Sequence, residues 1–484
     1  MTYEAKGLFI GGQWRTASGG AFDDYNPSTG KVWASVPNAT RADAAAAIAV
    51  AHAAFPAWAA TPFVQRAALL GKAAAILEAR QQDFVQAVGP ETGGTFGKCM
   101  YETTVTPGVY RTAAAMAFDS VGEVLPSAYD RSSMAVRSPI GVVSVISPWN
   151  FPMILSSRGI AFALAAGNTV VLKPSEESPV CGGLMFAEVF EEAGFPEGVV
   201  NVVTCGRDAV AEVGDELVAN PAVKGISFTG STPVGKAIAG KAGALLKKCC
   251  VELGGKDALI VLDDANLDHA VNAAAFGAFF HSGQICMAVE RIIVARNLAE
   301  EFTDKLAAKA GTLKVGPTDD KANVIGPLIN ARQADRVEAH IADALAQGAT
   351  ARAGGTRDGL FVPPTVLSGV TPQMSVWRDE TFGPVAPIIV ADDEQAMVDL
   401  ANDTEYGLSA GIITDDRERG MRIAGKLETG MAHINDSPVN DEFHAPFGGT
   451  KDSGTGRHGG RWAIETFTEI RWITSANGHR QYPF

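Results

Sequence analysis

The sequence predicts an α/β protein in which helices cover largely parallel β-sheets. Ala-rich segments with helical spacing alternate with short runs of β-branched residues, a pattern typical of parallel sheets layered with helices. With 484 residues, of which 46% are hydrophobic and 19% charged, the chain can bury a large core. At this length we expect two or three domains.

The first elements predicted are two Ala-rich helices, at residues 42–60 and 64–88. Two β-branched runs, at residues 140–146 and 168–172, then predict buried strands. A helix that begins near Pro152 is expected to join these strands. Together they form a βαβ unit, the start of a nucleotide-binding type of fold.

The strand pattern continues beyond this unit and then starts again. Runs at residues 199–203 and 225–228 extend the first series, whereas a run at residues 258–262 opens another after Glu252. We therefore expect a second α/β domain from near residue 253. The predicted division is a first domain over residues 1–120 and 140–252 and a second domain over residues 253–450.

Two segments fit neither layer. Residues 121–139 are strand-like and polar, and residues 469–474 form an isolated strand pattern near the C-terminus. Unpaired strand edges commonly pair with another chain. We expect residues 121–139 and 465–484 to form an oligomerisation arm and the protein to be a homodimer or a dimer of dimers. A simple intrachain hairpin is the alternative.

Composition and charge exclude several classes of protein. A net charge of −14 without a Lys/Arg run argues against a nucleic-acid partner. The N-terminal residues lack a signal-peptide pattern, and the apolar runs fall short of the ~20 residues that cross a bilayer, so we expect a cytoplasmic protein without a membrane partner. The six cysteines show neither a CxxC pair nor zinc-type spacing, so no disulfide framework and no metal site are expected.

Cys286 and Glu252 are the candidate reactive groups. Cys286 ends the run Gly283-Gln284-Ile285-Cys286, and Glu252 opens Glu252-Leu253-Gly254-Gly255-Lys256. A thiol that attacks a carbonyl carbon needs a base to deprotonate it or a water, and a carboxylate can serve. The resulting oxyanion needs donors, which the Asn150 amide and the backbone N–H of Cys286 can provide.

Each of these residues also has a purely structural interpretation. Cys286 could be a small buried hydrophobic residue, Asn150 a turn or cap residue, and Glu252 a carboxylate near solvent at a strand end.

Seven motifs in fixed order carry a resemblance to a known family. They are Pro148-Trp149-Asn150-Phe151-Pro152, Lys173-Pro174-Ser175-Glu176, Phe228-Thr229-Gly230-Ser231-Thr232, Glu252-Leu253-Gly254-Gly255-Lys256, Gly283-Gln284-Ile285-Cys286, Glu380-Thr381-Phe382-Gly383-Pro384 and Pro446-Phe447-Gly448-Gly449. In this order the motifs resemble the signatures of the NAD(P)-dependent aldehyde dehydrogenases. The resemblance implies a Rossmann-like cofactor domain, an α/β catalytic domain and a small β oligomerisation arm.

The resemblance also implies the reaction. Cys286 would add to an aldehyde to give a thiohemiacetal, hydride loss would leave a thioester, and Glu252 would activate the water that hydrolyses it. Asn150 would stabilise the oxyanion. One alternative is a coenzyme A-acylating enzyme, against which Glu252 argues because such members typically lack that glutamate. The other is a non-catalytic structural protein that retains the fold.

Cofactor residues are also carried over from the resemblance. The turn at Gly230 and Ser231 opens a helix whose free N–H groups could receive pyrophosphate, although it is not a full G-x-G-x-x-G fingerprint. NAD is expected rather than NADP, because the carboxylate of Glu176 would repel a 2′-phosphate. The expected cofactor-binding residues are Trp149, Lys173, Glu176, Gly230, Ser231, Glu380 and Phe382.

The substrate is expected to be an aromatic aldehyde of the benzaldehyde, vanillin or salicylaldehyde type, because the chain most resembles that branch of the family. Phe151, Leu155 and Arg158 share one helical face after Asn150. Ile285 and Met287 flank the thiol and would complete an apolar slot. Arg158 could contact a ring hydroxyl or, equally, form a salt bridge at the domain surface.

Overall fold

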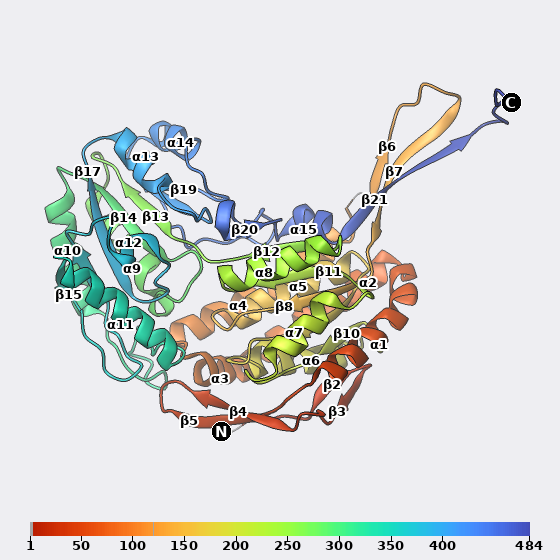
Figure 1. Ribbon diagram of the computed structural model, residues 1–484, viewed down its shortest axis with the longest axis horizontal. Coiled ribbons are helices and arrows are strands. Elements are labelled where there is room, and N and C mark those ends of the chain that lie inside the picture. The colour runs from red at the N-terminus through yellow and green to blue at the C-terminus, as the bar shows by residue number, and fades with distance from the viewer. Residues whose placement is uncertain (1–2, 120) are drawn as a thin grey trace.

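Two α/β bodies and a protruding β arm make up the computed structural model, which describes residues 3–119 and 121–484 (Figure 1). The predicted α/β class is confirmed. Met1, Thr2 and Ser120, which the predicted first domain also spans, lie outside the described residues.

The first body is built on an eight-stranded sheet of order β20-β12-β11-β8-β9-β10-β2-β3. Strands β8 to β12 pair in parallel, and β2, β3 and β20 pair antiparallel at the two sides. The chain runs outward from β8 through β9 and β10, then returns to β11 on the other side of β8. The crevice at the carboxyl ends of β8 and β11 is therefore a topological switch point, where such folds bind ligands. The strands are β2 Leu8–Ile10, β3 Gln13–Arg15, β8 Val142–Ile146, β9 Thr169–Lys173, β10 Val200–Val202, β11 Val223–Thr229, β12 Lys248–Glu252 and β20 Gly454–Thr455.

Helices cover both faces of this sheet, as the alternation of buried side chains requires. Val143 and Val145 of β8 face one hydrophobic core, with helices α2, α4, α5 and α6, whereas Val142 and Ile146 face another, with α1, α7 and α8. The predicted βαβ unit is present as β8, α5 and β9. The helices are α1 Arg41–Ala60, α2 Phe63–Ala79, α3 Gln81–Thr92, α4 Phe96–Met116, α5 Pro152–Ala165, the π-helix Val180–Leu184, α6 Met185–Ala193, α7 Val210–Ala219, α8 Thr232–Ala244 and α15 Gly460–Thr466.

The single helix predicted over residues 64–88 is wrong, because the structure breaks it into α2 and α3 at Arg80. Arg80 leaves helical geometry with ψ of 17°. Its guanidinium binds Asp83 at 3.2 Å and Glu188 at 2.7 Å, which anchors the break to a neighbouring helix. The apolar spacing continues across Arg80, so the periodicity did not reveal the turn.

A separate three-stranded sheet is formed by β1 (Tyr3–Glu4), β5 (Lys31–Pro37) and β4 (Ala21–Asn26).

The second body is built on a seven-stranded sheet of order β15-β16-β17-β14-β13-β18-β19. Ile260 of β13 faces a core with α11, α13 and α14, and its neighbours Leu259 and Val261 face a core with α9 and α10. The strands are β13 Asp257–Val261, β14 Val289–Ala295, β15 Thr350–Ala353, β16 Thr365–Ser368, β17 Val385–Ala391, β18 Ala410–Ile413 and β19 His433–Ile434. The helices are α9 Leu267–Phe279, the short 3-10 helix Phe280–Gly283, α10 Ala299–Thr312, α11 Ala331–Ala346, α12 Ser375–Arg378, α13 Glu394–Asn402, α14 Arg417–Ala424 and the 3-10 turn Lys451–Ser453.

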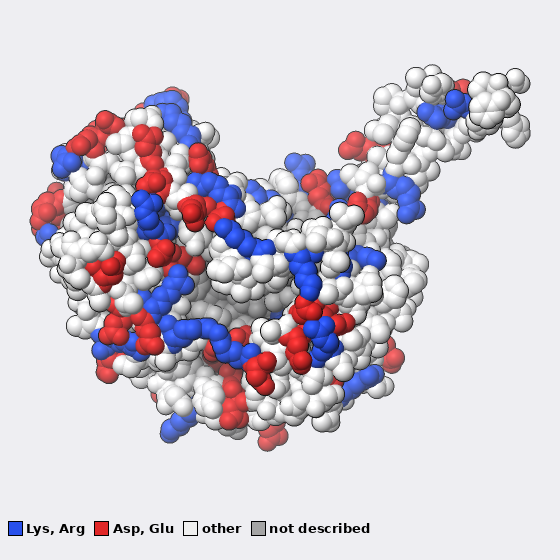
Figure 2. Space-filling model, viewed as in Figure 1, with Lys and Arg blue, Asp and Glu red and all other residues white. Residues whose placement is uncertain are grey.

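The arm consists of β6 (Gly122–Val124), β7 (Arg131–Pro139) and β21 (Thr468–Ala476), and it projects from the first body (Figure 1). Residues 469–474, predicted as an isolated strand, pair antiparallel with β7 of the same chain. Apolar side chains nevertheless stay exposed on the arm: Val124 by 83%, Trp472 by 65% and Ile470 by 60%. Figure 2 shows acidic and basic side chains interspersed over the visible face of the bodies, whereas the outer part of the arm is mostly uncharged.

Among the described residues, one helix, α1, is long and apolar enough to cross a membrane by length and composition alone. Core helices of soluble proteins pass the same test, and α1 packs on β8, β9 and β10 with Ile48 and Trp58 buried.

Candidate active site

A cavity with about 530 Å3 of empty space, open to solvent, contains the predicted nucleophile. Helices α4 and α5 of the first body form one wall. The end of α9, the segment around Cys286 and the chain between β19 and β20 form the rest. The lining residues are Tyr101, Asn150, Phe151, Ile154, Leu155, Arg158, Phe276, Phe280, Ile285, Cys286, Met287, Val439, Asn440, Asp441 and Phe447. All the substrate residues predicted from the sequence therefore lie in one cavity with Cys286 and Asn150.

The backbone before Cys286 is strained and held from several sides. His281 and Ser282 have φ of 49° and 56°, in the left-handed region that non-glycine residues rarely adopt. At Gly283, also left-handed, a Cβ atom would lie 2.2 Å from the carbonyl oxygen of Gly383, so only glycine fits. The buried Gln284 accepts a hydrogen bond from the Ile329 N–H at 2.9 Å. These contacts fix where the Cys286 thiol emerges.

Asn150 follows β8 and is tied directly to this segment. Its side-chain nitrogen donates to the carbonyl oxygen of Gln284 at 3.0 Å, and the side chain is buried. An amide nitrogen carries two N–H groups, so one remains to meet a negative oxygen near Cys286.

The helix after Asn150 is anchored as well. Glu102 of α4 accepts from the Met153 N–H at 2.8 Å, in the first turn of α5, and Lys98 pairs with Glu102 at 2.5 Å.

Glu252 ends β12, as the structural interpretation held, but it is buried, so its expected position near solvent is wrong. Within residues 3–119 and 121–484, neither carboxylate oxygen has a hydrogen-bond partner. Burial raises the pKa of Glu252 to about 7, although the neighbouring Cys286 thiol and Arg158 favour its ionised form. Burial, and next the charge of Glu252, raise the pKa of Cys286 well above its usual range. A protonated thiol and a carboxyl group that titrates near neutral pH thus lie together.

Arg158 lies in this cavity. It forms the salt bridge that was the alternative, with Asp441, but the pair lies inside the cavity and not at the surface. The guanidinium carbon lies 3.9 Å from the centre of the Phe447 ring. In the described part of the chain, Arg158 Nη1 and one oxygen of Asp441 remain without a partner. The cavity therefore offers both a donor and an acceptor beside its aromatic wall.

The comparisons with known proteins agree with this geometry. Residues 14–473 match the aldehyde dehydrogenase family. The chain belongs to this family. A vanillin dehydrogenase of Pseudomonas fluorescens is 46% identical over 478 residues, covering 98% of this chain and 99% of the relative. An NAD(+) benzaldehyde dehydrogenase of Pseudomonas putida is 44% identical over 481 residues, covering 99% of this chain and 98% of the relative.

A solved structure is similar throughout. A salicylaldehyde dehydrogenase from Pseudomonas putida G7, crystallised with salicylaldehyde, gives a TM-score of 0.97 at 37% identity over 100% of both chains. The expected aldehyde dehydrogenase fold is confirmed. The protein is an enzyme that oxidises an aldehyde to a carboxylic acid with a nicotinamide cofactor, which confirms the predicted reaction.

The residues expected to bind the cofactor lie in two groups in this aldehyde dehydrogenase. Lys173, Glu176, Gly230 and Ser231 follow β9 and β11, beside the switch point. Ser231 is the N-cap of α8, so the first turn of α8 presents free N–H groups next to it. Such a helix start suits a pyrophosphate.

Trp149, Glu380 and Phe382 form the other group, between the two bodies. The Trp149 and Phe382 rings meet edge to face at 5.5 Å, and Glu380 accepts from the Gly255 N–H at 3.1 Å. Burial, and next the charge of Glu290, raise the pKa of Glu380 to about 8. The aromatic pair is chemically suited to contact a nicotinamide ring, and the carboxyl group is suited to bind the hydroxyls of a ribose.

Sequence reasoning missed several residues that line the aldehyde dehydrogenase cavity. Phe447 was quoted within a family motif but given no role. Tyr101 and Asp441 lie far along the chain from Asn150 and Cys286, so no local pattern marks them. The missed residues are Tyr101, Ile154, Phe276, Val439, Asn440, Asp441 and Phe447.

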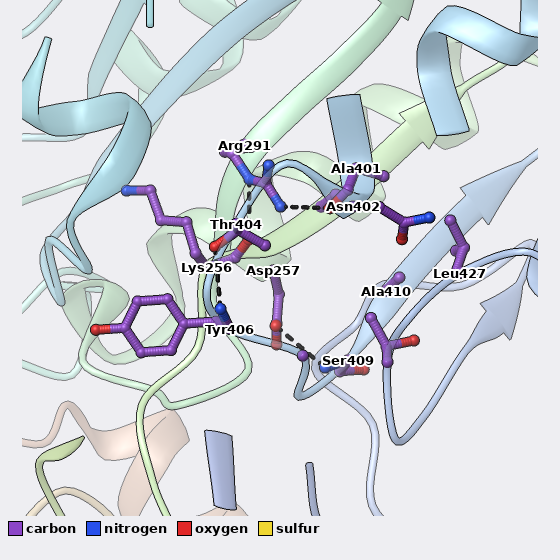
Figure 3. Close-up of a pocket in the computed structure, with 13 residues that line it drawn as sticks. Lys256, Asp257, Arg291, Ala401, Asn402, Thr404, Tyr406, Ser409, Ala410 and Leu427 are labelled. Carbon is purple, nitrogen blue, oxygen red and sulfur yellow. Dashed lines mark hydrogen bonds between the residues drawn. The ribbon is translucent and has the colours of Figure 1, made fainter. Parts of the chain in front are cut away.

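A second cavity, drawn in Figure 3, has a structural role. The Arg291 guanidinium donates to main-chain carbonyls, including Lys256 at 3.0 Å and Ala401 at 2.8 Å (Figure 3). Asp257 accepts from the Ser409 N–H at 3.1 Å. These bonds join β13 and β14 to the end of α13. Cys286 does not line this cavity.

Proposed function

We propose that the enzyme oxidises aromatic aldehydes of the benzaldehyde, vanillin and salicylaldehyde class. The observation that carries this proposal is the cavity wall beside Cys286. Phe151 lies 6.2 Å from Phe280 and 6.5 Å from Tyr101, ring centre to ring centre. Flat rings of this kind favour an aromatic ligand. The names of the relatives point to the same substrates.

Polar groups in the same cavity suit ring substituents. Arg158 Nη1 could donate to a hydroxyl or phenolate oxygen, and the unpaired oxygen of Asp441 could accept from a hydroxyl. Burial raises the pKa of Asp441. Because Arg158 already pairs with Asp441, a substituent would share the guanidinium and not replace the partner.

In the mechanism that we propose, the Cys286 thiol loses its proton to Glu252 and its sulfur adds to the aldehyde carbon. The second N–H of the Asn150 amide and the backbone N–H of Cys286 stabilise the resulting oxyanion. A nicotinamide held by Trp149, Glu380 and Phe382 would supply the acceptor for the hydride that leaves the substrate carbon. Glu252 must pass this first proton to solvent before hydrolysis. Its carboxylate then takes a proton from the water that attacks the thioester carbon, and the C–S bond breaks to release the acid and the Cys286 thiolate, which is reprotonated.

We propose NAD as the preferred cofactor, held by the residues named above. Glu176 would meet a 2′-phosphate with like charge, which lowers affinity for NADP. Arg207 contacts Glu176 at 3.4 Å and Lys173 lies at 3.9 Å from it. These cations reduce the repulsion, so the preference should be graded.

We also propose that the first body is the cofactor domain and the second the catalytic domain. The boundaries predicted from the sequence, 1–120 with 140–252 and 253–450, leave out β20 and α15, which belong to the first body. The exposed apolar side chains of the arm support a homodimer or a dimer of dimers. The six free cysteines support a cytoplasmic location.

A panel of aldehydes tests the substrate proposal. We expect NADH formation with higher kcat/KM for benzaldehyde, vanillin and salicylaldehyde than for acetaldehyde and hexanal. The difference should reach a few kcal/mol at most, because a hydrophobic pocket discriminates gradually. Cys286→Ala is the control for background oxidation. A higher kcat/KM for acetaldehyde or hexanal would refute the aromatic assignment but not the family.

A further inference from the structure

The segment that carries Glu380 and Phe382 is held in a strained shape by hydrogen bonds. Phe382 has φ of 54°, a left-handed conformation that costs a bulky residue energy. The N–H groups of Thr381 and Phe382 donate to the two carboxylate oxygens of Glu290, each at 2.7 Å. The carbonyl oxygens of the same two residues accept from Gln333 at 3.0 and 2.8 Å. Every main-chain polar group of Thr381 and Phe382 is therefore bound by a side chain.

Glu290 is itself held by a buried cation. Lys256 donates to Glu290 at 2.6 Å and to the carbonyl oxygen of Asp379 at 2.6 Å. Both charged side chains are buried, and burial is the main cause that lowers the pKa of Lys256. A buried charge is tolerated only when it is paired and its hydrogen-bonding sites are used, as they are here.

The next residue, Arg291, points elsewhere. Glu290 lies where the pairing of β13 with β14 shifts register, and Arg291 bonds to the Lys256 carbonyl and to carbonyls near α13. Figure 3 shows the Lys256 side chain extending away from Arg291. Of these two residues, Glu290 binds the segment of Phe382, whereas Arg291 binds carbonyls near α13.

We propose that Glu290 is a positioning residue for the cofactor. It joins three parts of the site: the linker from Glu252 to Lys256, strand β14 that follows Cys286, and the segment from Glu380 to Phe382. It thereby holds the Glu380 carboxyl group beside Gly255 and the Phe382 ring beside Trp149. The inference rests on the proposed function, in which Glu380 and Phe382 hold the nicotinamide end of the cofactor.

The test is Glu290→Gln, which keeps the size of the side chain. Glutamine has one acceptor oxygen, so its NH2 group must face the Thr381 or Phe382 N–H, or Lys256. We expect a higher KM for NAD and a slower NADH burst, by about 10²-fold if the segment shifts by ~1 Å. Hydrolysis of an activated ester without NAD, which needs Cys286, Asn150 and Glu252 but no nicotinamide, should be unchanged.

A double variant, Glu290→Met with Lys256→Met, distinguishes the positioning effect of Glu290 from the cost of leaving the buried Lys256 charge unpaired. It removes both charges and both acceptor oxygens. We expect it to regain the thermal stability that Glu290→Gln loses, yet to keep the NAD defect. If Glu290→Gln does not fold, the double variant carries the test, with ester hydrolysis reporting an intact thiol site.

A normal NADH burst and KM for NAD in Glu290→Gln would overturn the inference, and so would a normal burst in the double variant. An equal loss of ester hydrolysis and NADH formation would also overturn it, because the residue would then be merely structural. Failure of the proposed function looks different, since the unmodified enzyme would then show a higher kcat/KM for acetaldehyde or hexanal than for aromatic aldehydes.

Discussion

Replacing Glu252 by glutamine should separate the two halves of the reaction. Glutamine keeps the shape of the side chain but cannot accept a proton, so the thioester at Cys286 persists once formed. We expect a burst of one NADH per site that is slower than in the unmodified enzyme, because bulk base must then deprotonate the thiol. Steady turnover should then fall about 10²–10⁴-fold, the usual contribution of a general base.

The raised pKa of Glu252 sets the pH dependence of the same step. Only the ionised carboxylate accepts a proton, so hydrolysis should increase with pH and level off above the pKa of about 7. For such a group the ionised fraction rises about fivefold from pH 6 to pH 7, whereas an ordinary glutamate, with a pKa near ~4.3, would change by only a few per cent. The magnitude therefore distinguishes a buried Glu252 from a solvated one.

The assay is rapid mixing with saturating NAD and benzaldehyde, followed at NADH absorbance across this pH range. Cys286→Ala is the control and should show no burst. Unchanged steady turnover in Glu252→Gln would remove this residue from the mechanism. A flat steady rate between about pH 6 and pH 8, with a full burst at each pH, would show that the pKa inferred from burial does not govern hydrolysis.

Three further perturbations probe the rest of the site. Arg158→Met should lower kcat/KM for vanillin relative to benzaldehyde by about tenfold, because a hydrogen bond to the ring substituent is lost; the ratio cancels any common effect on Cys286, and an unchanged ratio would contradict substrate contact. Glu176→Gln should raise kcat/KM for NADP by about tenfold through removal of like charge, with NAD as the internal control. Removal of residues 468–484 should expose the edge of β7, and light scattering should then show dissociation or aggregation. A truncated enzyme with the oligomeric state of the full chain would contradict a role of the arm in oligomerisation.

The fold was predictable where it depends on local patterns. Strands β8 and β9 are runs rich in β-branched residues and buried on both faces, and such runs stand out in any sequence. The break at Arg80 was not predictable, because ion pairs to a distant helix stabilise it while the apolar spacing continues. The pairing of β21 with β7 within the chain was an alternative that the sequence left open, since the two partners lie far apart in the chain.

The site divides in a similar way. Cys286, Glu252 and Asn150 each lie in a recognisable motif, so their identity could be inferred. The groups that orient them and shift their pKa values come from other parts of the chain. The pKa of Glu252 depends on burial between the two bodies, and the Asn150 amide is aimed by a carbonyl beside the thiol. No spacing rule places Asp441 beside Arg158, or the Thr381 and Phe382 amides on Glu290. The reactive groups can therefore be predicted from the sequence. The groups that orient them cannot, because they come from distant segments that meet only in the folded structure. The proton and hydride steps depend on that orientation, so the sharpest remaining tests fall on Arg158 and Glu290 and not on Cys286.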